Sequence, residues 1–385
     1  MQRLGRARRC YACRAPFREA HFFYGSLCPP CAAHNFAKRT QTANLRGRVA
    51  LVTGARITSG HETALKLLRA GATVIGTTRF PRDAAERFGA ERDFGAWARR
   101  LHLYGLDFRV PGWVEAFAEH VRVNFDRLDV LINNAAQTIR RPAPFYAHLV
   151  PGECAPPGDV ARRLWPTLAA GRDFAAGQAR GLGARGDGAG LSALLSQAAV
   201  LPDDLAALGP ADAPAIVGAA IDAREVNSWA QRLGDVAGAE CLEALLVNAA
   251  APFLLSGGLR PLMARDALAA KWVVNVAAVE GQFSRRQKDD RHPHLNMAKA
   301  ALNMLTRSSA EGFARDRIFM NSVDVGWFSN GEPAHVADAM RERGFSLPLD
   351  ATDAAARVCD PVFSGVLTGE NTYGKLLKDY RPVDW

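Results

Sequence analysis

The chain has few tyrosines: six occur among its 385 residues, and none lies between Tyr146 and Tyr373. That long stretch therefore contains no phenol that a reaction could use as a general acid. The whole chain also lacks any run of about 18 apolar residues, which predicts that nothing spans a membrane. The basic N-terminus, MQRLGRARRC, has no apolar core after it. Export is therefore not expected, and we predict a cytoplasmic protein.

Acidic residues are in the minority, with 39 Asp and Glu against 48 Lys and Arg and a formal net charge of +9. The basic residues are spread along the chain and form no single patch in the sequence, so nucleic-acid binding is not expected. The apolar share of 48% and the charged share of 23% are ordinary for a globular protein with a large core.

Cysteine is sparse except near the N-terminus, where four of the seven form two Cys-x-x-Cys pairs: Cys10, Cys13, Cys28 and Cys31. A loop of 14 residues separates the pairs, a spacing typical of structural zinc sites. Disulfides are the alternative, but they conflict with a cytoplasmic protein, and redox pairs rarely come in duplicate. We predict a closed zinc ribbon over residues 1–40 that folds a small unit and performs no chemistry.

The stretch from Arg48 to Arg79 predicts a dinucleotide site. An apolar run at 49–52 indicates a buried strand, and a glycine loop, an amphipathic helix and a second strand at 73–77 follow. This unit lets the backbone approach a pyrophosphate at the helix N-terminus, although an ordinary βαβ turn would show the same glycines. The second strand ends in Arg79 where NAD would favour an acidic residue, which favours NADP(H).

The elements downstream continue the alternation of strand and helix. Strands are predicted at 101–106, 129–132 and 272–276, and helices at 82–100 and 113–125. The pattern indicates an α/β fold class: a Rossmann-type, doubly wound parallel sheet preceded by the small zinc ribbon.

Several motifs resemble those of the short-chain dehydrogenases/reductases over about residues 46–385. Thr53-Gly54 and Gly60 match the glycine motif, with Thr58 at its middle position, and Asn133-Asn134-Ala135-Ala136 is similar to a motif that stabilises the central sheet. The resemblance implies NADP(H) as cofactor. The implied cofactor-binding residues are Thr53, Gly54, Arg56, Gly60, Arg79, Asp107, Asn134, Ala135 and Lys299.

The resemblance also implies catalytic positions and an assembly. Asn248 and Lys299 match the family's active-site asparagine and lysine, and Asp324-Val325-Gly326 stands where a Pro-Gly motif usually flanks the nicotinamide. The family usually associates through helices that correspond to Cys241–Met263 and Met297–Gly312. A homo-oligomer is therefore expected.

Two departures from the family pattern fall on the catalytic acid and its helper. The position of the acidic tyrosine, four residues before Lys299, holds Leu295, and the position of the carbonyl-polarising serine holds Ala278. Neither side chain can donate a proton or bind an oxyanion. The following loop supplies His292 and His294, and we predict that one of them serves as the acid at neutral pH.

Basic pairs follow two predicted strands at one edge of the sheet: Arg140 with Arg141, and Arg285 with Arg286. Because ligands bind where parallel strands end, these side chains are candidates for binding a small anionic substrate. Solvated loop charges are the alternative.

An insertion at 139–240 divides the Rossmann-type domain into residues 46–138 and 241–385. Asn134 and Asn248 are 114 positions apart, whereas the family spans a few dozen. The place of the insertion over the catalytic edge of the sheet predicts a substrate lid or a dimerisation element. The part from Ala169 to Gly190 is rich in Ala, Gly and Arg and is expected to be loosely packed.

Three functions remain open from these residues. The first is an NADP(H)-dependent oxidoreductase with a non-standard acid. The second is a scaffold that senses NADP(H) or binds partners without hydride transfer. The third is a non-redox lyase or isomerase in the same pocket. Leu295 and Ala278 favour the second and third, whereas Lys299 and Asn248 favour the first.

Overall fold

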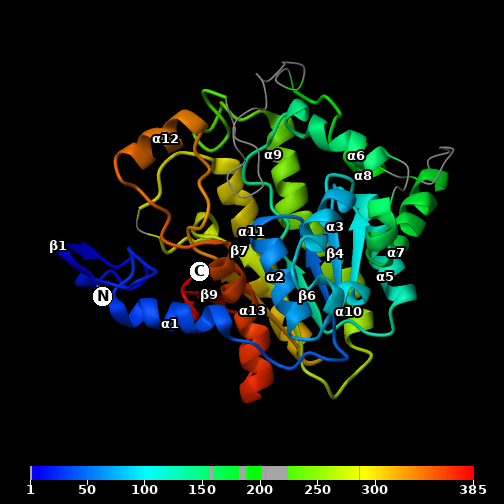
Figure 1. The fold of residues 1–385 in the computed structure, drawn as a ribbon, viewed down its shortest axis with the longest axis horizontal. Helices are drawn as coiled ribbons and strands as arrows, with labels where there is room; N and C mark the ends of the chain where they lie inside the picture. The colour runs from blue at the N-terminus through cyan, green and yellow to red at the C-terminus, as the bar shows by residue number, and fades with distance from the viewer. Residues whose placement is uncertain are drawn as a thin grey trace.

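The computed structural model describes residues 2–155, 159–181, 188, 190–201, 204, 224–285 and 287–385. Its centre is an eight-stranded sheet in the order β10-β9-β8-β7-β6-β3-β4-β5 (Figure 1). Neighbouring strands pair in parallel, except that β9 and β10 form an antiparallel hairpin at one edge. The strands are β3 (Val49–Thr53), β4 (Thr73–Thr78), β5 (Leu101–Gly105), β6 (Val130–Asn133), β7 (Lys271–Ala277), β8 (Ile318–Asp324), β9 (Leu376–Lys378) and β10 (Arg381–Val383).

The order of the strands reverses at the centre, because β3 pairs with β4 on one side and with β6 on the other. Open α/β sheets bind ligands beyond the carboxyl ends of the strands at such a point.

The five predicted strands lie within one residue of β3, β4, β5, β6 and β7 at each end. Their short apolar runs are buried on both faces, which makes the pattern easy to recognise. The predicted fold class is confirmed.

Helices cover both faces of the sheet (Figure 1). One face carries α2 (Thr58–Arg69), α3 (Pro81–Gly89) and α13 (Ala351–Thr368), and the other carries α5 (Pro111–Asn124), α10 (Ala251–Met263) and α11 (Pro293–Ala314). The single helix predicted at 82–100 is broken into α3, α4 (Phe94–Trp97) and a 3₁₀ turn. The break lets Phe94 and Trp97 pack edge-on in the same core as Phe88.

The N-terminal ribbon consists of the hairpin β1 (Gln2–Arg9) and β2 (Pro16–Ala20) followed by α1 (Pro29–Thr40). It has a small apolar core of its own, and α1 packs against α13 (Figure 1). Arg39 of α1 pairs with Asp350 at 2.7 Å and with Asp353 at 3.0 Å, and Lys38 pairs with Asp360 at 2.5 Å. The ribbon is therefore fastened to the main sheet through α13.

The described part of the insertion covers the free edge of the sheet. It contains a 3₁₀ helix (Ala143–Leu149), α6 (Val150–Cys154), α7 (Asp159–Gly181) and α8 (Leu191–Leu195). Helix α7 packs on β5, and a Cβ at Gly171 would lie 2.0 Å from the carbonyl oxygen of Leu103. The prediction of loose packing from Ala169 is wrong up to Gly181, because this glycine lets the helix approach the strand closely.

One helical stretch, Gly238–Met263, is long and apolar enough by composition to cross a membrane. It comprises α9 (Gly238–Leu245), a π-helical turn (Leu246–Ala250) and α10. The expectation that nothing spans a membrane is drawn from uninterrupted apolar runs, and it stays a prediction. Half of the apolar window is buried inside the protein, where α10 packs against α5, and core helices pass the same composition test.

Candidate functional site

The glycine loop between β3 and α2 has the close backbone contacts of a dinucleotide site. Gly54 has a φ of +67°, and a Cβ at Gly60 would lie 2.1 Å from the carbonyl oxygen of Gly54. Thr58, at the position where the middle glycine is usual, also has a positive φ, of +51°. Helix α2 begins there after Ile57, whose side chain has no polar atom to cap the first N–H groups. These groups are available to an anion.

Hydrogen bonds between β3 and the segment after β6 hold the floor of this loop. The hydroxyl of Thr53 accepts the N–H groups of Asn134 and Ala135, each at 2.9 Å. The side-chain amide of Asn134 donates to the carbonyl oxygen of Thr53 at 2.9 Å, and Ser59 of α2 donates to the amide oxygen at 2.9 Å. The predicted residues Thr53, Asn134 and Ala135 thus meet at the carboxyl ends of β3 and β6.

Two arginines lie around an aromatic pair at the end of β4. The guanidinium of Arg79 lies 4.4 Å from the ring centre of Tyr146 and 5.5 Å from that of Phe80. Arg56, from the glycine loop, lies 5.2 Å from the Phe80 ring and pairs with Asp83 at 2.8 Å. Tyr146 comes from the insertion, so the insertion forms part of the surroundings of Arg79.

Asp107, a predicted cofactor-binding residue after β5, is buried and paired inside the protein. Arg109 donates to both of its carboxylate oxygens, with the shortest distance 2.7 Å. Arg109 also pairs with Glu243 of α9 at 3.1 Å. Burial alone would lower the pKa of Arg109, but the two carboxylates raise it above its usual value. A bound cofactor would therefore contact an Asp107 carboxylate that is already paired with Arg109.

Lys299 and Asn248 are both buried. The ammonium of Lys299 donates to the carbonyl oxygen of Val276 at 2.8 Å. Burial lowers its pKa to about 8, and the charge of Glu280 opposes the shift. Asn248 donates to the carbonyl oxygens of Gln137 at 3.0 Å and Ala244 at 2.9 Å.

The amide oxygen of Asn248 is buried and has no hydrogen-bond partner among the described residues. It lies in the π-helical turn Leu246–Ala250, and such turns are frequent at functional sites. This acceptor suits a bound water.

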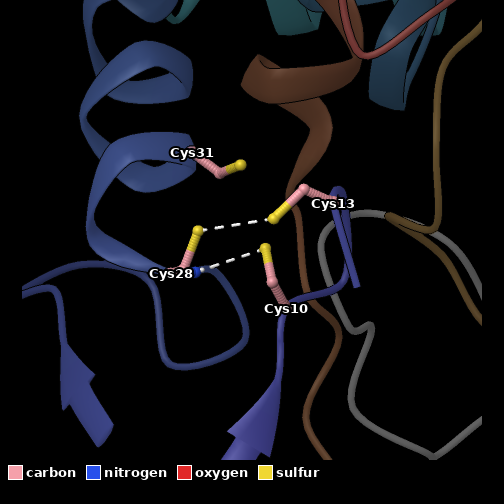
Figure 2. A group of neighbouring side chains, drawn as sticks. All are labelled: Cys10, Cys13, Cys28 and Cys31. Atoms are coloured by element: carbon pink, nitrogen blue, oxygen red, sulfur yellow. Dashed lines mark hydrogen bonds between the residues drawn. The ribbon is translucent and has the colours of Figure 1, made fainter. Parts of the chain in front are cut away.

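The four ribbon cysteines form a cluster in which the ligand sulphurs all lie within 4.8 Å of one another. Figure 2 shows the side chains converging from the loop after β1 and from the start of α1. The Cys13 and Cys28 sulphurs are 3.6 Å apart, and tetrahedral zinc with bonds of about 2.3 Å separates its sulphurs by about 3.8 Å. The cluster therefore has the donors and spacing of a closed zinc site.

Backbone hydrogen bonds favour the ionised form of one of these thiols, that of Cys10. The N–H of Cys28 donates to the sulphur of Cys10 at 3.3 Å. Burial would raise the pKa of Cys10, but backbone N–H groups, including those of Cys13 and Cys28, lower it to about 7. Burial raises the pKa of Cys31. The ribbon thus holds one sulphur that ionises readily beside one that needs the ion's own charge to do so.

Solved structures share this fold. NADPH-bound carbonyl reductase from chicken fatty liver aligns with a TM-score of 0.52 and 18% identity, over 89% of this chain and 100% of that one. Pseudomonas aeruginosa RhlG, solved as an NADP active-site complex, aligns with a TM-score of 0.53 and 18% identity, over 87% and 95%. At this identity the likeness shows the arrangement of the sheet and helices.

Comparison with known sequences shows the family of the chain. The family model described as short chain dehydrogenase matches residues 48–148. An uncharacterized protein, R665, of Acanthamoeba polyphaga mimivirus is 31% identical over 387 residues, which cover 97% of this chain and 74% of the relative. A 2-dehydro-3-deoxy-D-gluconate 5-dehydrogenase of Pseudoalteromonas atlantica is 37% identical over 100 residues, or 26% of this chain and 39% of that protein. The chain belongs to the short-chain dehydrogenase/reductase family.

Within this short-chain dehydrogenase/reductase, the usual acid position is closed. Leu295 is 2% exposed on α11, and Ala278 follows β7 in an extended conformation. His294 is also buried, and burial, followed by the charge of His292, lowers its pKa to about 4. Its imidazole is therefore neutral at neutral pH, which weighs against the prediction that His294 supplies the proton.

His292 stands at the start of α11 with a φ of +41°. Its ring stacks on Trp229 with the ring centres 4.2 Å apart, and its Nδ1 donates to the Trp229 carbonyl oxygen at 2.9 Å. Because a carbonyl oxygen only accepts, this contact holds a proton on Nδ1 and leaves Nε2 as the ring nitrogen that can exchange a proton. Of the two predicted histidines, His292 is the better candidate for an acid.

Arg140 does not face a substrate. It is 5% exposed, and it pairs with Asp204 at 2.7 Å and with Glu243 at 3.0 Å. This corrects the prediction that Arg140 binds a substrate anion, because its guanidinium already meets two buried carboxylates. Arg141 lies 5.1 Å from the ring centre of Phe145, Arg285 is exposed, and Arg286 lies outside the described residues.

Sequence reasoning missed three partners of the predicted residues. Glu243 joins Arg109 to Arg140, Asp204 completes the pairing of Arg140, and Tyr146 covers Arg79. The only sequence signal was the place of Arg109, two positions after Asp107. Glu243, Asp204 and Tyr146 are distant in the chain, and no local pattern marks them.

Proposed function

We propose that this short-chain dehydrogenase/reductase is an NADP(H)-dependent oxidoreductase with an altered proton donor. The observation that carries the proposal is the pair of arginines around Phe80, with Arg79 at the end of β4 where an NAD enzyme would have a carboxylate. The guanidinium groups would bind the 2′-phosphate of NADP(H), and α2 would bind the pyrophosphate. NADP(H), when bound, supplies or accepts the hydride.

The relatives support the same cofactor. The chicken carbonyl reductase is described as NADPH-bound and Pseudomonas aeruginosa RhlG as an NADP complex. The chain has the residues needed to hold the rest of the cofactor: the close approach of Gly54 to Gly60 for the pyrophosphate, and the buried ammonium of Lys299 for the ribose.

The chain's own residues divide the remaining work. Lys299 would hold the ribose hydroxyls, and its charge would favour a nearby oxyanion. The open amide oxygen of Asn248 would hold a water that carries protons between solvent and this ammonium. His292 would exchange the proton of the substrate oxygen in place of the missing tyrosine. The substrate is then a small carbonyl compound or alcohol, and Arg140 has no part in binding it.

The cofactor preference tests the central observation. Replacing the cation in Arg79→Asp should weaken NADPH binding by about 10- to 100-fold and leave NADH binding unchanged or tighter. Isothermal titration of zinc-replete protein measures both affinities. The matched control is Arg99→Asp, which places the same charge change at an exposed arginine after α4. Equal weakening by both variants, or no NADPH binding by the parent, would contradict the proposal.

A second function is favoured by Leu295 and Ala278, because neither the usual acid nor its helper is present. The chain would then bind NADP(H) as a sensor or partner-binding scaffold, or perform an elimination or isomerisation without hydride transfer. Oxidation of NADPH in the presence of carbonyl compounds separates the two. Turnover that falls at least about tenfold in His292→Asn favours the oxidoreductase, and tight NADPH binding without any oxidation favours the sensor.

We also infer that the four-cysteine cluster holds one structural zinc ion. Four thiolates leave no open coordination position, so the ion would fold the ribbon and do no chemistry. Metal analysis of the purified protein should give one zinc per chain, and Cys13→Ser with Cys28→Ser should lose it.

A further inference from the structure

The zinc ribbon touches the segment that follows β8, at the edge where the cofactor and substrate would sit. Tyr11 lies between Cys10 and Cys13 in the first cysteine pair. Its hydroxyl oxygen accepts the backbone N–H of Trp327 at 2.8 Å. Trp327 comes directly after Gly326, in the stretch that matches the family's nicotinamide-flanking motif. A side chain inside the metal knuckle therefore holds the backbone of this stretch.

The contact is close on the side of Gly326 as well. Gly326 has a φ of +78°, and a Cβ there would lie 3.3 Å from the Tyr11 hydroxyl and 2.5 Å from Leu349. Its N–H donates to the carboxylate of Asp324 at 2.9 Å, and Asp324 pairs with Lys378 at 2.6 Å. The turn after β8 is thus fixed from the strand on one side and from the ribbon on the other.

The far end of the same segment also rests on the ribbon. We call residues 326–350 the α12 segment, after the helix α12 (Ala334–Glu342) that it contains. Phe328 near its start and Leu349 near its end both pack into the small apolar core of the ribbon. Asp350, at its last position, pairs with Arg39 of α1 at 2.7 Å. The ribbon therefore anchors both ends.

Between these ends the α12 segment is thinly held. None of the nine residues of α12, all of which the structure describes, is buried. The segment meets the catalytic side at Gly331, where a Cβ would lie 2.7 Å from the Trp229 ring, and at Glu332, which pairs with Arg291 at 3.2 Å. Trp229 is the residue that stacks on His292. Figure 1 shows α12, in orange, above the ribbon.

We propose that Tyr11 is a positioning residue through which the metal-bound ribbon holds the α12 segment against the Trp229–His292 pair. With the four cysteines on their ion, the knuckle is rigid, and the Tyr11 hydroxyl stays under the Trp327 N–H. When the ion is lost, the knuckle becomes mobile. The α12 segment, which buries little of its own surface, is then no longer held against the Trp229–His292 pair. The ribbon thus acts on the site without supplying a reacting group. The statement about the ion and the site rests on the proposed function, whereas the contact between ribbon and segment does not.

Amide hydrogen exchange at Trp327 tests the contact directly, because this N–H is the donor. Tyr11→Phe removes the acceptor and keeps the ring, so exchange at Trp327 should become at least about tenfold faster. The emission of Trp327, taken as the difference from Trp327→Phe, should shift to the red as the segment opens. The zinc content and the exchange of amides in α1 should stay as in the parent, which shows that the ribbon is still folded.

The matched control is Tyr24→Phe. Tyr24 is another ribbon tyrosine, whose hydroxyl donates to Asp353, a residue outside the α12 segment. This variant should leave exchange at Trp327 unchanged, even where it lowers the stability of the ribbon. Unchanged exchange in Tyr11→Phe, or equal acceleration in both variants, overturns the positioning role.

Metal removal gives a second measurement that needs no substitution. Treatment of the full chain with a zinc chelator should accelerate exchange at Trp327 by at least as much as Tyr11→Phe, and zinc should restore the slow rate. Slow exchange after complete zinc removal, or a chain purified without zinc, overturns the dependence on the ion. NADPH affinity is titrated on the same samples. A parent that fails to bind NADPH contradicts the proposed function, and the exchange rates still decide the role of Tyr11.

Discussion

Lys299 is the residue whose ionisation we expect to be visible in cofactor binding. Burial lowers its pKa to about 8, so the ammonium that would hold the ribose is lost as the pH rises through this value. If only the protonated form binds, the dissociation constant for NADPH should be about tenfold higher at pH 9 than at pH 7. Fluorescence titration across this range measures it. In Lys299→Met the affinity should be weak and independent of pH, and a flat profile in the parent would contradict the assigned role.

His294 should make the protein sensitive to mild acid. Its pKa is about 4 in the fold and about 6.5 in an unfolded chain. Between these values the unfolded state binds more protons, so the free energy of unfolding falls as the pH drops through this window, by up to roughly 3 kcal/mol. Urea denaturation at pH 7 and pH 4.5 measures the loss. The parent should lose more stability than His294→Gln, and equal losses would show that the imidazole is not held neutral.

A buried network of ion pairs joins two elements, the insertion and α9. Arg140 meets Asp204 and Glu243 there. Burial would raise the pKa of Asp204, but Arg140 and two backbone N–H groups hold it well below its usual value. The stability that this carboxylate contributes is therefore present above pH 4 and is lost only as the pH falls further.

Removing one partner of that pair should be costly. Asp204→Asn leaves Arg140 buried with a single carboxylate, and we expect a loss of about 3 kcal/mol in the free energy of unfolding, measured in urea. The double variant Arg140→Met/Asp204→Asn removes the charge of both partners, keeps an amide oxygen that accepts backbone N–H groups, and should recover part of the loss. A change below about 0.5 kcal/mol in Asp204→Asn would place these residues outside the stabilising core.

Elements differ in how far their own residues specify them. β3 and β4 were predictable, because a short apolar run that is buried on both faces can be recognised without its neighbours. α7 was not, since its Ala-, Gly- and Arg-rich residues carry few apolar side chains. What holds it is the close approach of Gly171 to the backbone of Leu103, and a sequence does not show which strand a helix will meet.

Contacts between residues far apart in the chain explain which parts of the site could not be predicted from the sequence. The cysteine cluster, the glycine loop and the loss of the tyrosine at Leu295 all follow from short motifs. The partners of Arg140 and Tyr11 do not, because Asp204 is 64 positions from Arg140, and Trp327 is 316 positions from Tyr11. The sequence therefore predicts a cation free to bind a substrate at Arg140, whereas the fold gives it two carboxylates.

At the same scale, we propose that two copies of the chain associate through α10 and α11. Large apolar side chains are exposed on these helices, among them Phe253 (62%), Met297 (52%) and Met304 (55%). They lie on the two helices through which the family usually associates, and burying them would remove apolar area from water. Half of the apolar window that ends in α10 is not buried within one chain, which leaves surface for a second copy.

Phe253→Glu should therefore shift the protein from dimer to monomer in sedimentation velocity at micromolar concentration, because a carboxylate at the interface would be desolvated without a partner. Leu367→Glu places the same charge at an exposed apolar position on α13, on the opposite face of the sheet from these helices, and should leave the sedimentation coefficient unchanged. The monomer should keep its zinc and its NADPH affinity, since neither candidate site includes Phe253. A parent that sediments as a monomer, or a Phe253→Glu variant that remains dimeric, would remove α10 from the interface.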